Sequence, residues 1–111
     1  MRRRLLRLGL YADEQGLAWV EGLVEDAAGS RRARILDVSV AHADDDSLDF
    51  LVEQWRIEHP GRSSGTRQPV DMEVRLRCSL RTWRAVRKAV PTALCPQGSA
   101  PHICRVPWTL G

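Results

Sequence analysis

The stretch from residue 70 to residue 80 constrains the fold of this chain more than any other. Apolar and polar residues alternate along it without a break. The apolar set is Val70, Met72, Val74, Leu76, Cys78 and Leu80. Successive side chains of a β-strand point to opposite sides, so this pattern predicts a strand with one buried face and one wet face. Such strands are typical of antiparallel sheets that are covered on one face only.

Further strands are predicted in the first part of the chain. Leucines stand at every second position near its start: Leu6, Leu8 and Leu10. Residues 13–16 have the composition of a turn, and residues 17–25 are predicted to return as a second strand of a hairpin. Residues 32–41 are rich in β-branched side chains and predict a third strand. Because consecutive strands usually pair, residues 4–41 are predicted to form a meander.

A first helix is predicted over residues 47–58. Its apolar residues recur at the spacing of one helical face: Leu48, Leu51, Val52 and Trp55. Asp46 or Ser47 is expected to cap the N-terminus of this helix. The helix is expected to end before Pro60, because the residue that precedes a proline is biased away from the α region.

A second helix is predicted over residues 80–90. Ser79 or Thr82 is expected to cap it, and Pro91 to end it. An exposed loop is predicted over residues 59–69, and the proline-rich tail, 91–111, is expected to be an irregular strap or an edge strand.

These elements predict an α+β fold in the order β-β-β-α-β-α. It would be an antiparallel sheet of about four strands, with two helices on one face and an irregular C-terminal tail. A chain of 111 residues can bury about two thirds of its unfolded surface on folding. Residues 1–111 are therefore expected to form a single domain.

Charge is segregated along the chain. All 14 acidic residues lie between residues 13 and 73. The two ends of the chain, residues 1–12 and 74–111, carry basic residues and no acidic ones. Cations without nearby acids gather on the predicted strand and helix near the C-terminus: Arg75, Arg77, Arg81, Arg84, Arg87 and Lys88. This basic surface would meet the acidic middle of its own chain, an acidic protein or a nucleic acid.

The leading functional prediction is a small, non-enzymatic protein-binding or adaptor module. It would act on another protein or on itself, as a homodimer through an open sheet edge, with Trp108 as a candidate anchor for the partner. The first alternative is a nucleic-acid-binding accessory protein that uses the basic surface, although the chain carries no recognised nucleic-acid motif. The second is a small enzyme whose site cannot be read from the sequence, since no catalytic motif is present.

No cofactor is expected, and a zinc site is kept as a weak alternative. Cys78, Cys95, His102 and Cys104 are ligands of the kind that zinc prefers, but they lack the usual C-x2-C spacing. A disulfide between Cys95 and Cys104, or three free thiols, are the alternatives. The odd number of cysteines is typical of a reducing compartment. With no long apolar run and no signal-peptide cleavage site, the protein is expected to be cytoplasmic and to have no membrane partner.

Overall fold

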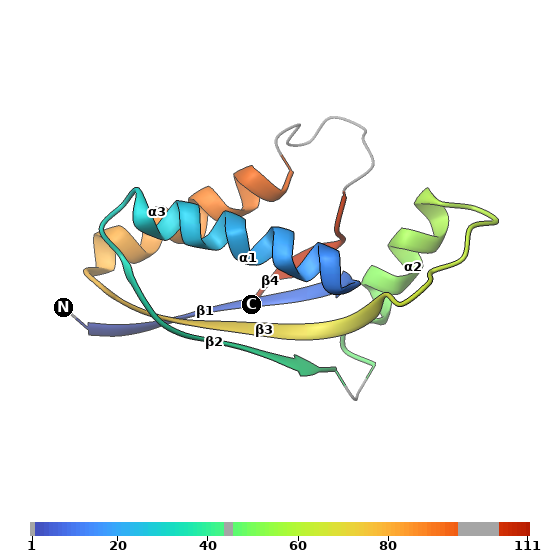
Figure 1. The fold of residues 1–111 in the computed structure, drawn as a ribbon, viewed down its shortest axis with the longest axis horizontal. Coiled ribbons are helices and arrows are strands. Elements are labelled where there is room, and N and C mark those ends of the chain that lie inside the picture. The colour runs from blue at the N-terminus through green and yellow to red at the C-terminus, as the bar shows by residue number, and fades with distance from the viewer. Residues whose placement is uncertain (1, 44–45, 96–104) are drawn as a thin grey trace.

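The computed structural model describes residues 2–43, 46–95 and 105–111 (Figure 1). Its elements in chain order are β1 (Arg2–Ala12), α1 (Glu14–Gly29), β2 (Arg34–His42), α2 (Asp49–Glu58), β3 (Gln68–Cys78), α3 (Leu80–Leu94) and β4 (Trp108–Leu110). The strands form one antiparallel sheet in the order β2-β3-β1-β4. The predicted α+β class and the four-stranded antiparallel sheet are confirmed.

The predicted order of the first elements is wrong. Residues 17–25 were expected to form a strand, but they lie inside α1. The residues that α1 buries most deeply recur at helical spacing: Gly16, Val20, Val24, Ala27 and Ala28. The side chain of Asp13 caps the helix, because its Oδ1 accepts a hydrogen bond from the Gly16 N–H at 2.8 Å. The N-terminal half is therefore a β-α-β unit and not a meander.

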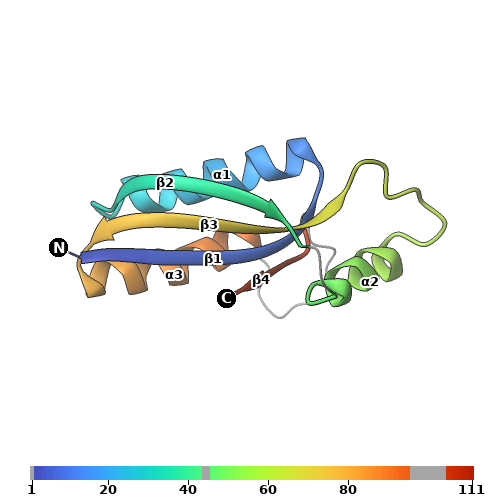
Figure 2. The same cartoon turned by 90° about the horizontal axis from the view of Figure 1, so that it is seen from below.

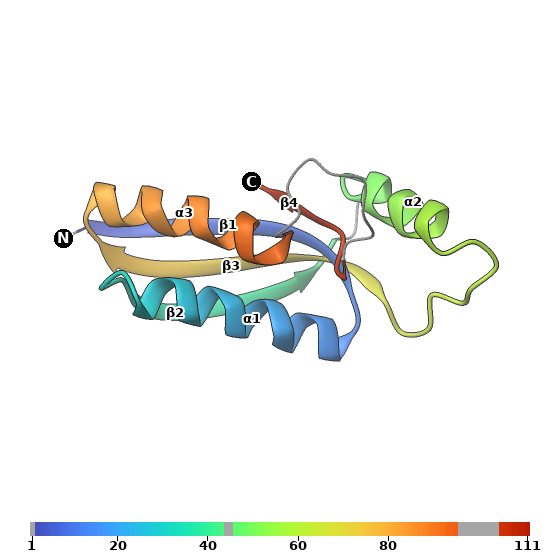
Figure 3. The same cartoon turned by 90° about the horizontal axis from the view of Figure 1, so that it is seen from above.

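The connections in the sheet are split β-α-β units. β1 and β2 are joined through α1, and β3 lies between them; β3 and β4 are joined through α3, and β1 lies between them. In Figures 1 and 3, α1 and α3 lie side by side over one face of the sheet. Figure 2 shows the opposite face, which these two helices leave uncovered.

The main core lies between the sheet and these two helices. The sheet contributes the alternating residues of its two central strands, including Leu6, Leu8, Leu10 and the apolar set of β3 from Val70 to Cys78. Helix α1 adds Val20 and Val24, and α3 adds Val86 and Val90, all of them buried. Strand β3 therefore has the buried and exposed faces that its alternation predicts.

Helix α2 is confirmed as a helix, but it does not join the two helices on the covered face. It lies at one end of the sheet and packs against the uncovered face, where Tyr11, Leu48, Leu51 and Trp55 form a second small cluster. Gly9 permits this approach, because a Cβ atom there would lie 2.6 Å from Leu48 Cδ2.

The helix ends differ in part from the expectations. Ser79 caps α3 as predicted, with its Oγ accepting a hydrogen bond from the Thr82 N–H. Leu48, and neither Asp46 nor Ser47, is the N-cap residue of α2. Helix α3 continues through Pro91 to Leu94, because Leu94 is buried in the core and holds the last turn in place.

The C-terminal tail returns to the sheet. The expectation of an edge strand is confirmed for residues 108–110, where Trp108 pairs with Leu10 and Leu110 pairs with Leu8. The part of the tail from 96 to 104 lies outside the described residues. Within the described part of the chain, no helix is both long and apolar enough to cross a bilayer.

Candidate functional site

The six cations of the predicted basic surface lie on two different sides of the molecule. Arg75 and Arg77 are exposed positions of β3 that alternate with its buried residues, so they project from the uncovered face of the sheet (Figure 2). The other four belong to α3, on the covered side: Arg81, Arg84, Arg87 and Lys88. The structure brings each group together but does not join the two.

In the middle of the uncovered face, the protein neutralises its own charges. Arg75 Nη1 lies 3.2 Å from Asp37 Oδ2 on β2, and its Nη2 lies 3.9 Å from Glu73 Oε2. Glu73 Oε1 also lies 3.4 Å from Arg7 Nε on β1. Two arginines and two acids thus form a balanced network across three strands. Arg75 therefore meets the acidic middle of its own chain.

One end of the same face carries unbalanced positive charge. Arg77 on β3 is paired directly with Arg3 on β1 and with Arg34 on β2. All three side chains are exposed. Among the described residues they have no ion pair and no hydrogen-bond acceptor. We call this row of three residues, Arg3, Arg34 and Arg77, the arginine rung.

Exposed leucines lie close to the arginine rung. Leu5 follows Arg3 on the same face of β1, is paired with Arg75 and is 41% exposed. Leu36, in the irregular part of β2 two residues after Arg34, is 40% exposed. Leu80, two residues after the end of β3, is 42% exposed. This end of the molecule therefore offers cations and apolar side chains together.

The outer side of α3 holds the second group of cations. Arg87 Cζ lies 5.5 Å from the centre of the Trp83 ring, and Arg87 Nη2 is 3.5 Å from the carbonyl oxygen of Gly111. Arg84 and Lys88 line a shallow depression beside them. Within the described part of the chain, none of these cations has an acidic partner.

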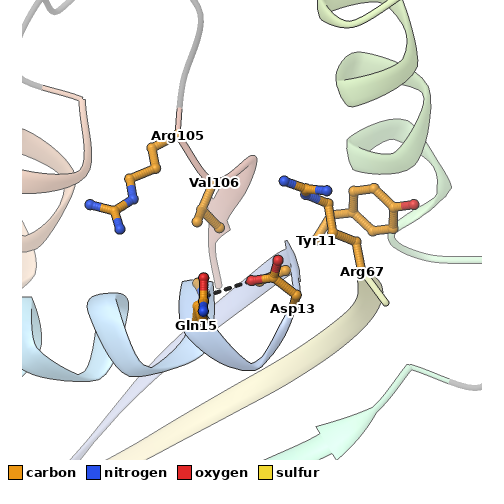
Figure 4. Close-up of a pocket in the computed structure, with 8 residues that line it drawn as sticks. Tyr11, Asp13, Gln15, Arg67, Arg105 and Val106 are labelled. Atoms are coloured by element: carbon orange, nitrogen blue, oxygen red, sulfur yellow. Dashed lines mark hydrogen bonds between the residues drawn. The ribbon is translucent and has the colours of Figure 1, made fainter. Parts of the chain in front are cut away.

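A small polar pocket lies at the start of α1 (Figure 4). Its volume is about 120 Å³, and its walls include Tyr11, Asp13, Arg67 and Arg105. Both arginines are already engaged with aromatic rings: Arg67 Cζ is 4.8 Å from the ring centre of Trp55, and Arg105 Cζ is 4.6 Å from that of Trp19. The Asp13 carboxylate caps the helix and opposes the binding of an anion in this pocket.

The candidate zinc ligands are only partly described. Among the described residues, no three potential metal ligands lie together, and His102 and Cys104 lie outside those residues. Cys78 is buried in the core, and Cys95 is half-buried. No disulfide joins these two cysteines. Burial raises the pKa of the Cys78 thiol above its usual 9.0, although nearby Arg4 opposes this shift. At neutral pH this cysteine is therefore a protonated core residue.

The candidate anchor Trp108 lies in β4, where it is half-buried and packs against the main core. It lies next to Pro91, Thr92 and Cys95 around a shallow hollow at the end of α3. Much of its ring is therefore occupied by contacts within the chain.

The fold and its charged surfaces define an α+β sheet protein with one uncovered, partly cationic face. No protein-family model, no curated protein and no solved structure matches this chain.

Proposed function

We propose that this protein is a non-enzymatic protein-binding module and that the arginine rung holds an acidic segment of its partner. The observation that carries the proposal is the pairing of Arg77 with both Arg3 and Arg34 on one exposed face. No acid among residues 2–43, 46–95 and 105–111 pairs with the rung, in contrast to the Arg75 network two residues away.

The arginine rung lowers the stability of the sheet in the free protein. Like charges directly opposite one another on neighbouring strands destabilise a sheet. An acidic ligand removes this repulsion, and each guanidinium can form two parallel hydrogen bonds with a carboxylate. Binding of a negatively charged segment therefore turns an unfavourable arrangement into a favourable one.

The exposed leucines favour a protein partner over a nucleic acid. Leu5 and Leu36 flank the rung and supply apolar contact area that phosphates and sugars do not use. Single-stranded nucleic acids are usually held by aromatic side chains on which the bases stack. Tyr11, the aromatic residue that β1 directs to this face, is buried under α2.

Two triple variants with the same loss of charge test the proposal. In one, each residue of the arginine rung is replaced by alanine: Arg3→Ala, Arg34→Ala and Arg77→Ala. The matched control removes three cations from α3: Arg81→Ala, Arg84→Ala and Lys88→Ala. A partner captured from the native host and purified should bind the wild type and the control alike. Its affinity for the rung variant should be lower by about tenfold or more.

Circular dichroism checks that both variants are folded. Retained binding by the rung variant, or an equal loss in the control, would contradict the proposal. A labelled oligonucleotide serves as the second probe. Tight binding of the oligonucleotide that falls steeply with salt would instead support the nucleic-acid alternative.

A further inference from the structure

Strand β2 is the outermost strand of the sheet on one side. Seven of its nine residues are exposed, and only Ile35 and Val38 are half-buried. Its inner edge pairs with β3, while no described strand pairs with its outer edge. An unpaired edge presents N–H and C=O groups that can accept a further strand. Native edges are often protected by lysine, proline or a β-bulge. β2 contains no lysine or proline, and its one irregularity lies between Ile35 and Asp37, so the regular part from Val38 to His42 is the open part of the edge.

Helix α1 overhangs this edge. Figures 2 and 3 show that the N-terminal half of α1 lies outside the outer edge of β2, and Figure 1 shows α1 above the plane of the sheet. A strand added to β2 would lie beneath the overhanging helix.

The side of α1 above the edge is acidic. Glu14, Glu21 and Glu25 recur at intervals of seven and four residues and so share one stripe of the helix. The opposite side of α1 faces α3, because Leu23, Asp26 and Ala27 line the groove between the two helices. The glutamate stripe therefore lies on the side of α1 away from α3. Figure 3 shows that this side of α1 is the side of the open β2 edge. These glutamates form no ion pair among the described residues.

We infer that the outer edge of β2 binds an extended basic segment of a partner protein as a fifth strand. Val38 and Val40 are on the covered side of β2, paired with Val74 and Met72, and Val40 is 45% exposed. The apolar stems of lysine or arginine in an added strand lie across these valines. Their charged ends then reach the glutamate stripe, while backbone hydrogen bonds hold the strand.

This site is separate from the proposed function, because it binds the opposite charge through different residues. The probe is a short peptide, blocked at both ends, in which lysine and valine alternate. Binding is followed by NMR chemical shifts, and hydrogen exchange reports which amides the peptide protects. We expect saturable binding and protection of amides in residues 36–42.

Two control peptides and two variants make the test specific. A peptide of alternating glutamate and valine, and a lysine–valine peptide with N-methylated backbone, should both fail to bind. Glu21→Lys with Glu25→Lys should weaken binding of the lysine–valine peptide about tenfold. Asp26→Lys, on the α3 side of the same helix, should leave the affinity within about twofold.

Three results would overturn the inference. The first is equal binding of the glutamate peptide, and the second is protection at a site other than β2. The third is a dimer of the protein alone, seen by sedimentation, in which the same β2 amides are protected; the edge would then be occupied by a second copy.

Discussion

Two arginines of β3, two residues apart on the same face, have opposite surroundings. Arg77 stands between two arginines, and Arg75 stands beside two acids. Arg77→Glu should therefore stabilise the protein, by about 0.2–1 kcal/mol for each cross-strand pair that becomes attractive. Urea unfolding of the purified variant measures this change.

Arg75→Glu is the matched comparison. The same change of charge two residues away replaces its ion pairs by repulsion from Asp37 and Glu73, so it should destabilise the protein. If both variants shift the urea midpoint in the same direction, the charge arrangement described for this face is wrong.

The sequence alone predicts part of this arrangement. Alternation within residues 70–80 correctly places Arg75 and Arg77 on the exposed face of β3. It does not reveal that Arg3 and Arg34 lie beside Arg77, because they come from strands that are distant in the chain. Their alignment depends on the register of two long-range strand pairings, which local periodicity does not determine.

At the scale of single elements, the caps of α1 and α2 differ. Asp13 caps α1 through a hydrogen bond of 2.8 Å, whereas Asp46 is exposed and is not the N-cap of α2. Asp13→Ala should lower the free energy of unfolding by about 1 kcal/mol, because it leaves an N–H of the first turn without its acceptor. Asp46→Ala should change it by less than half as much. Thermal unfolding of the two variants side by side measures the difference.

The same helix shows why one element was predicted wrongly. Leu17, Trp19 and Leu23 have odd numbers, and this suggests a strand with period two. In the structure they are half-buried flanks of α1, and the centre of its buried face is Val20 and Val24. Valine is common in strands, so Val20 and Val24 also favoured the strand prediction. Their spacing of four residues is helical, and packing against the sheet decides in favour of the helix.

At the scale of the whole molecule, the described residues form two apolar clusters of unequal size. The main core joins the sheet to α1 and α3, while α2 is held mainly by the cluster of Tyr11, Leu48, Leu51 and Trp55. We expect α2 to open at a lower free energy than β1 and β3, since few buried side chains hold it. Native-state hydrogen exchange in low denaturant measures both. Equal opening free energies for α2 and the central strands would contradict this.

The strand order also has a consequence for the synthesis of the protein. Among the described strands, β1 pairs with β3 and β4, and these pairings join Arg2 to Cys78 and Leu8 to Leu110. When β1 leaves the ribosome, its leucines have no strand to pair with until residues 68–78 have been made. At about 5–20 residues per second, this wait lasts roughly 3–13 s. During that time the leucines of β1 have no partner strand, and the four arginines of the same segment, Arg2, Arg3, Arg4 and Arg7, keep nascent chains apart by their like charge.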